Sequence, residues 1–140
     1  TGLDPQSRHQ VWDRLVKLKK RGLTMLLTTH YMDEAENLCD RLLIMDRGRI
    51  IAEGSPRNLI VEHAAESVIE IEGPGPEVIN YIRQHDIRHD DLGERIIIYT
   101  EAQGELENEV RKKFCMDACL FRAGNLEDVF LRLTGRELRE

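Results

Sequence analysis

The sequence predicts an α/β first part over residues 1–63, followed by a small ferredoxin-like α+β domain over residues 64–140. Thr24–Thr29 is an apolar run that ends abruptly at His30, as expected of a strand buried on both faces of a parallel sheet. Apolar residues at helical spacing precede and follow this run. After residue 64 the predicted strands and helices follow one another in the order βαββαβ, which is the ferredoxin-like order.

Composition indicates a folded globular protein, because 41% of the 140 residues are apolar and 33% are charged. The formal net charge of -6 argues against a nucleic-acid partner. No stretch approaches the roughly 20 apolar residues that cross a bilayer. The three cysteines are odd in number and lack zinc-finger spacing, which predicts reduced thiols and not a disulfide framework at Cys39, Cys115 and Cys119.

A first helix is predicted over Pro5–Arg21. Asp4 is its N-cap, Pro5 fits the first helical position, and Gly22 ends it. Its apolar stripe consists of Val11, Trp12, Leu15, Val16 and Leu18.

Shorter elements follow the predicted strand Thr24–Thr29. Asp33 and Glu34 favour the first turn of a second helix. The apolar run Arg41–Met45, a turn and Arg49–Glu53 predict a hairpin, and Ser55 then caps a short helix.

The second part begins with Ser67–Glu72, whose alternation predicts a strand with one solvated face. The later elements are a helix carrying Val78 and Ile82, strands Ile87–Asp91 and Arg95–Thr100, a helix carrying Val110 and Phe114, and a strand Ala118–Arg122. A last helix is capped by Asn125 and Asp128 and ends at Gly135, before the charged tail Arg136–Glu140. We expect Phe114, Phe121 and Phe130 to lie in the core.

His30 stands where the predicted strand ends, which is the edge at which open α/β sheets bind ligands. A histidine there can donate a hydrogen bond to an oxyanion, or can simply be solvated in a loop. His85 and His89 allow a metal site or a solvated turn, and the nearby Leu92-Gly93 turn favours the latter. No metal-ligand set is therefore predicted.

Four segments resemble the ATP-binding subunits of ABC transporters in order and spacing. They are the D-loop (Thr1–Pro5), the H-loop (Leu27–His30), the following helix and strand entry (Asp33–Glu36 and Cys39–Arg41) and the closing hairpin (Met45–Pro56). Asn125–Gly135 resembles the terminal signature of drug-resistance-type exporters.

The resemblance implies that residues 1–63 are the C-terminal part of a P-loop NTPase (RecA-like) nucleotide-binding domain. His30 would then contact the γ-phosphate of ATP and help to align the attacking water. Gly2, Leu3 and Asp4 would contact the facing subunit across a nucleotide sandwich, and Asp4 can cap its helix as well.

The same resemblance implies ATP and Mg²⁺ as cofactors of the intact parent, a second ATP-binding subunit in a homodimer, and a membrane-spanning permease. The parent would lie at the cytoplasmic face of the membrane and power the export of a drug-like or lipid-like substrate.

The sequence contains no Gly-x-x-x-x-Gly-Lys-Ser/Thr loop, no Ser-Gly-Gly signature and no apolar run ending in Asp-Glu. We therefore expect a C-terminal fragment that by itself neither binds nor hydrolyses ATP. Its exposed apolar surfaces, the stripe of the first helix and Met25–Leu27, are expected to drive dimerisation or swapping.

The alternative is a non-enzymatic regulatory or dimerisation module with a ferredoxin-like ligand-binding domain. It would explain residues 64–140 but gives no reason for the pattern formed by Asp4, His30 and Gly48.

Overall fold

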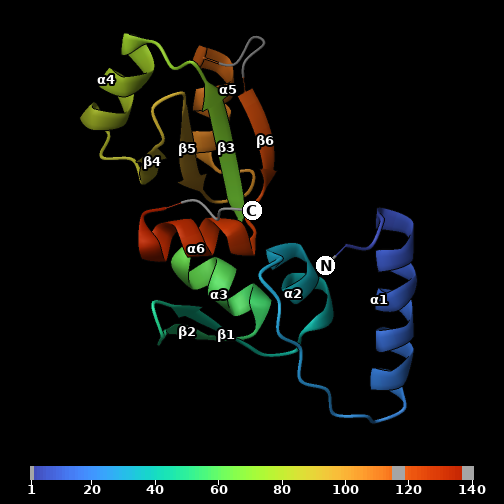
Figure 1. Ribbon diagram of the computed structural model, residues 1–140. Helices are drawn as coiled ribbons and strands as arrows, with labels where there is room; N and C mark the ends of the chain where they lie inside the picture. The colour runs from blue at the N-terminus through green and yellow to red at the C-terminus, as the bar shows by residue number, and fades with distance from the viewer. Residues whose placement is uncertain (1, 115–118, 137–140) are drawn as a thin grey trace.

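The computed structural model describes residues 2–114 and 119–136, so the predictions for Thr1, Cys115, Ala118 and the last four residues lie outside it. The elements follow one another in nearly the predicted order (Figure 1). They are α1 (Pro5–Lys20), α2 (Met32–Leu38), β1 (Leu42–Asp46), β2 (Arg49–Gly54), α3 (Pro56–His63), β3 (Ser67–Glu72), α4 (Pro76–Gln84), β4 (His89–Asp91), β5 (Arg95–Thr100), α5 (Glu105–Phe114), β6 (Cys119–Ala123) and α6 (Leu126–Thr134).

The predicted buried strand Thr24–Thr29 is wrong for this structure. Residues 23–29 have no regular structure, and Leu26 is 99% exposed. A central strand needs hydrogen-bonded neighbours, and no described strand pairs with this stretch. Both sheets of the described part are antiparallel, so the parallel sheet of a RecA-like domain is not seen there.

The four-stranded sheet has the order β4-β5-β3-β6, and every neighbouring pair in it is antiparallel. With α4 and α5 it confirms the predicted sequence of elements, βαββαβ. In the β3–β5 register Ile69 lies opposite Ile98 and Ile71 lies opposite Ile96. These residues form one core cluster with apolar side chains of α4 and α5.

The other face of this sheet is covered as well, which corrects the predicted solvated face of Ser67–Glu72. Val68 is buried as completely as Ile69, because Val68 packs in a second cluster that includes α6. The alternation in sequence therefore reflects two different neighbours and not a core on one side and water on the other.

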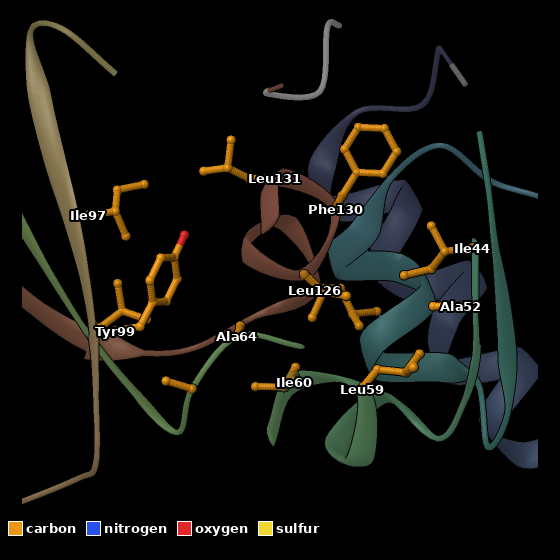
Figure 2. Close-up of a cluster of buried hydrophobic side chains, with 13 residues drawn as sticks. Ile44, Ala52, Leu59, Ile60, Ala64, Ile97, Tyr99, Leu126, Phe130 and Leu131 are labelled. Atoms are coloured by element: carbon orange, nitrogen blue, oxygen red, sulfur yellow. The ribbon is translucent and has the colours of Figure 1, made fainter. Parts of the chain in front are cut away.

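The second core cluster joins the sheet to α6, α3 and the β1–β2 hairpin. Figure 2 shows side chains converging on Leu126 from the sheet, where Tyr99 lies, and from the hairpin, where Ile44 lies. The cluster contains residues from both sides of the predicted boundary at 63/64, and the division into two domains stays a prediction.

The cysteines differ from one another. Cys39 is a free, half-buried thiol whose pKa is raised by burial. Cys119 is disulfide-bonded, so the prediction of a thiol there is wrong. A disulfide requires two Cβ atoms about 4 Å apart, which cysteine count and spacing in sequence do not determine. Phe130 is buried as predicted, and Phe114 and Phe121 are partly buried.

Among the described residues, no helix combines the length and the apolar character that a membrane span requires.

Candidate functional site at the start of helix α2

His30 lies in the entry to α2, one residue before its N-cap. The residue is exposed, and its ring centroid lies 4.2 Å from that of Tyr31. The Tyr31 N–H donates to Thr29 Oγ1 over 3.0 Å, which shapes this turn. The imidazole is therefore free to meet a ligand, although the described residues place no parallel sheet edge beside it. The phosphate role of His30 stays a prediction.

Asp4 lies at the corresponding end of α1. Its Oδ1 accepts from the Ser7 N–H over 2.8 Å and its Oδ2 from the Ser7 hydroxyl over 2.9 Å, which confirms the predicted N-cap. These hydrogen bonds hold the pKa of Asp4 below its usual value. Gly2 has φ +78°, and Leu3 is 53% exposed. For Gly2, Leu3 and Asp4, contact with a facing subunit remains a prediction.

Helices α1 and α2 are joined near their N-terminal ends. The Trp12 indole N–H donates to Glu34 Oε1 over 3.0 Å, and Arg8 lies 3.6 Å from the Asp33 carboxylate. The Arg8 guanidinium also lies 5.7 Å from the ring centroid of Tyr31. Sequence reasoning did not place Arg8 or Trp12 against the first turn of α2. The helical stripe containing Trp12 was the available signal.

The pKa of Glu34 is lowered. A hydrogen bond from the Thr29 hydroxyl is the largest cause, and the bond from Trp12 assists, while partial burial opposes both. Glu34, the third residue of α2, is therefore held as a carboxylate, and the helix dipole also favours negative charge there.

The C-terminal ends of the two helices are tethered as well, because Lys19 Nζ donates to the Leu38 carbonyl over 3.2 Å and to Asp40 Oδ1 over 2.9 Å. The helices therefore run side by side in the same direction. The predicted D-loop (Gly2–Asp4) and the predicted H-loop (His30) thus enter the helix pair at the same end.

The two other candidate residues, His85 and His89, contact backbone carbonyls that lie close to them in the sequence. His85 Nδ1 lies 2.9 Å from the Tyr81 carbonyl, and His89 Nδ1 lies 2.8 Å from the Ile87 carbonyl. In the described part of the chain, no cluster of three or more His, Cys, Asp or Glu side chains has the arrangement of a metal site.

Comparison with known proteins supports the predicted resemblance along the whole chain. Residues 76–135 match the family described as nodulation factor export protein NodI, C-terminal domain. The chain is similar to three proteins named Nod factor export ATP-binding protein I. They come from Mesorhizobium japonicum (46% identity), Neorhizobium galegae (48%) and Rhizobium sp. strain N33 (48%), with 100% of this chain aligned in each case.

The chain covers 41%, 40% and 46% of these relatives, respectively, and so spans less than half of their length. The matches confirm the resemblance to ATP-binding subunits of ABC transporters.

Proposed function

We propose that this chain, which is similar over its full length to ATP-binding subunits of ABC exporters, is the C-terminal part of such a subunit. The intact subunit would hydrolyse ATP and drive export through a separate permease at the cytoplasmic face of the membrane. The observation that carries the proposal is the shared end of α1 and α2, where the D-loop-like Gly2–Asp4 and the exposed His30 enter together.

In the proposed mechanism, the His30 imidazole donates a hydrogen bond to a γ-phosphate oxygen. Phosphoryl transfer depends on positioning and charge stabilisation, so a well-placed donor at that oxygen matters. The exposed ring fits this task, whereas the sequence has no phosphate-binding loop to hold ATP and Mg²⁺. Those groups would be held mainly by the remainder of the parent, and Mg²⁺ would supply charge neutralisation on the phosphates. The 140-residue chain alone is then inactive.

The test is His30→Gln in the full-length subunit. We expect kcat to fall about 100-fold, the size typical for loss of one transition-state donor, with ATP binding retained. His85→Gln, on the exposed end of α4, is the matched control and should leave kcat unchanged. Equal kcat values for wild type and His30→Gln would contradict the proposal.

The substrate and the assembly are part of the same proposal. The relatives are named for Nod factor export, so a Nod factor is the first candidate within the predicted drug-like or lipid-like class. A homodimer of ATP-binding subunits fits the exposed Gly2–Asp4 segment. Transport into vesicles that contain subunit and permease, with and without ATP, would test the substrate.

The alternative of a non-enzymatic regulatory module is less well supported. It offers no account of why residues 1–63, and not the second part alone, align with ATP-binding proteins.

A further inference from the structure

A side-chain hydrogen bond joins α2, the helix that follows His30, to α6. Glu36, half-buried on α2, accepts a hydrogen bond at Oε2 from the backbone N–H of Leu126 over 3.1 Å. Leu126 is the first residue of α6 and lies 90 positions further along the sequence. The two helices lie next to each other (Figure 1). Met32 and Ala35 of α2 pack against the second core cluster, to which α6 contributes.

Glu36 completes the cap of α6. The first N–H groups of a helix have no partner within it. The capping box of α6 uses two N–H groups, because the Asp128 N–H donates to Asn125 Oδ1 over 3.0 Å and the Asn125 N–H donates to Asp128 Oδ2 over 2.9 Å. The Leu126 N–H is taken by Glu36, so a residue of α2 serves as part of the α6 terminus.

The α6 side of this contact is firmly held. The Leu126 side chain is fully buried, and Asp128 is 2% exposed. Arg122 of β6 donates two hydrogen bonds to Asp128, over 2.7 and 2.8 Å, and a third to Glu70 of β3 over 3.4 Å. The N-terminus of α6 is thus fixed to the four-stranded sheet.

The α2 side is held far less firmly. This helix has seven residues, all of them described, and none is buried. Met32 and Ala35 are only partly buried against the core cluster. A short helix with so little burial depends on its polar tethers for its direction. On the α1 side these tethers are the Trp12 bond to Glu34, the Arg8–Asp33 ion pair and the Lys19 bond to the Leu38 carbonyl. On the α6 side the tether is the Glu36 bond to Leu126.

We propose that Glu36 is a positioning residue, through which the second part of the chain holds α2 and thereby sets where His30 presents its imidazole. The inference rests on the proposed function of His30. It gives the accessory domain a defined task, namely to fix the direction of the helix that His30 precedes. Because small displacements of a catalytic group cost large factors in rate, loss of this tether affects kcat more than ATP binding.

The experiment compares four forms of the full-length subunit: wild type, Glu36→Ala, Glu36→Gln and the control Asn37→Ala. Asn37 is the exposed neighbour on the same helix, and its side chain donates to the Asp33 carbonyl and not to α6. We expect Glu36→Ala to lower kcat about tenfold with little change in KM for ATP. Glu36→Gln keeps an acceptor oxygen and should restore most of the activity, and Asn37→Ala should match wild type.

A double-mutant cycle with His30→Gln separates positioning from general damage. If Glu36 acts through His30, Glu36→Ala costs nothing further once His30 is replaced. Equal kcat for Glu36→Ala and Asn37→Ala, or the same tenfold loss in both His30 backgrounds, would overturn the inference.

The His30→Gln variant alone tests the proposed function, and the Glu36 variants test the inference. Should His30→Gln alone leave kcat unchanged, the proposed function fails, and with it the inference. Should Glu36→Ala fail to fold, Glu36→Asp takes its place. It keeps the charge but withdraws the oxygen by one methylene, so a folded, fully active Glu36→Asp subunit would also overturn the inference.

Discussion

At the residue scale, Gly124 shows how closely two backbone segments approach beside α6. A Cβ atom at this position would lie 1.9 Å from the Ala65 carbonyl oxygen. The Gly124 N–H donates to the Glu66 carbonyl over 3.1 Å, which holds the two segments together. Glycine is therefore required here by space and not by a special φ angle.

Replacing Gly124 with Ala should lower the free energy of unfolding by about 2 kcal/mol or more, because backbone has to move to admit the methyl group. Chemical denaturation of the 140-residue chain measures this value. Gly75→Ala is the control. Its Cβ meets only the flexible end of Glu77, and a loss within about 1 kcal/mol is expected. Similar losses at Gly124 and Gly75 would contradict the argument.

Glu127 should give stability a distinct pH dependence. Burial raises the pKa of Glu127 above its ordinary value of 4.5, and the neighbouring carboxylates of Asp128 and Asp33 add to the shift. The folded chain then holds this proton more tightly than the unfolded chain, so the contribution of Glu127 to stability falls as pH rises through the range just above 4.5.

Glu127→Gln is accordingly expected to raise the unfolding free energy at pH 7 by less than about 1 kcal/mol. The gain should disappear well below pH 4.5, where Glu127 is protonated in both the folded and the unfolded state. Urea denaturation of wild type and Glu127→Gln, at pH 7 and again well below pH 4.5, measures the difference in unfolding free energy. Glu72→Gln, at the exposed end of β3, serves as the control. A gain of equal size at both pH values would count against the assignment.

At the element scale, the helices differ sharply in how they are anchored. In α6, five of nine residues are buried and a capping box fixes the start. In α1, whose residues are all described, none is buried, and the helix is held by an N-cap and by the polar contacts of Arg8, Trp12 and Lys19 with the region around α2. Local signals therefore form both helices, but tertiary packing stabilises them unequally.

Hydrogen exchange of the 140-residue chain should resolve this difference. Amides of α1 are expected to exchange at least about 100-fold faster than those of β3 and β5, because few buried apolar contacts oppose the local opening of α1. Mass spectrometry of peptides from each element measures these exchange rates. Comparable protection in α1 and β3 would show that α1 is anchored more firmly than its contacts indicate.

At the scale of the whole molecule, the loop between α1 and α2 exposes apolar side chains that a folded protein usually covers. Leu23 is 52% exposed, Met25 37%, Leu26 99% and Leu27 36%. Several exposed apolar side chains within one short segment favour association.

We therefore expect the 140-residue chain to self-associate as its concentration rises, in line with the dimerisation expected from its sequence. Light scattering over a concentration series measures the mass of the particles in solution. Leu26→Glu should shift this mass toward that of the monomer, because a carboxylate is costly to bury in a contact. Val61→Glu, at another exposed apolar position, is the control. A monomer at every concentration would refute this expectation.

The sequence alone was sufficient for features that depend on residues three or four positions apart. The caps at Asp4, Ser55 and Asn125 form as predicted, because each side chain accepts from an N–H three positions later. The order βαββαβ followed from local periodicity in the same way. The ABC resemblance was equally available from motif order and spacing, and the comparisons confirm it.

Only the tertiary structure decided features that depend on distant partners. The apolar run of residues 24–29 predicted a buried strand. A strand forms only where other strands supply hydrogen bonds, and no described strand does so here. Cys119 is paired, and Glu36 meets Leu126 across 90 positions, because the fold brings separate elements together. Local propensity acts through neighbours in sequence, whereas burial and pairing are set by neighbours in space.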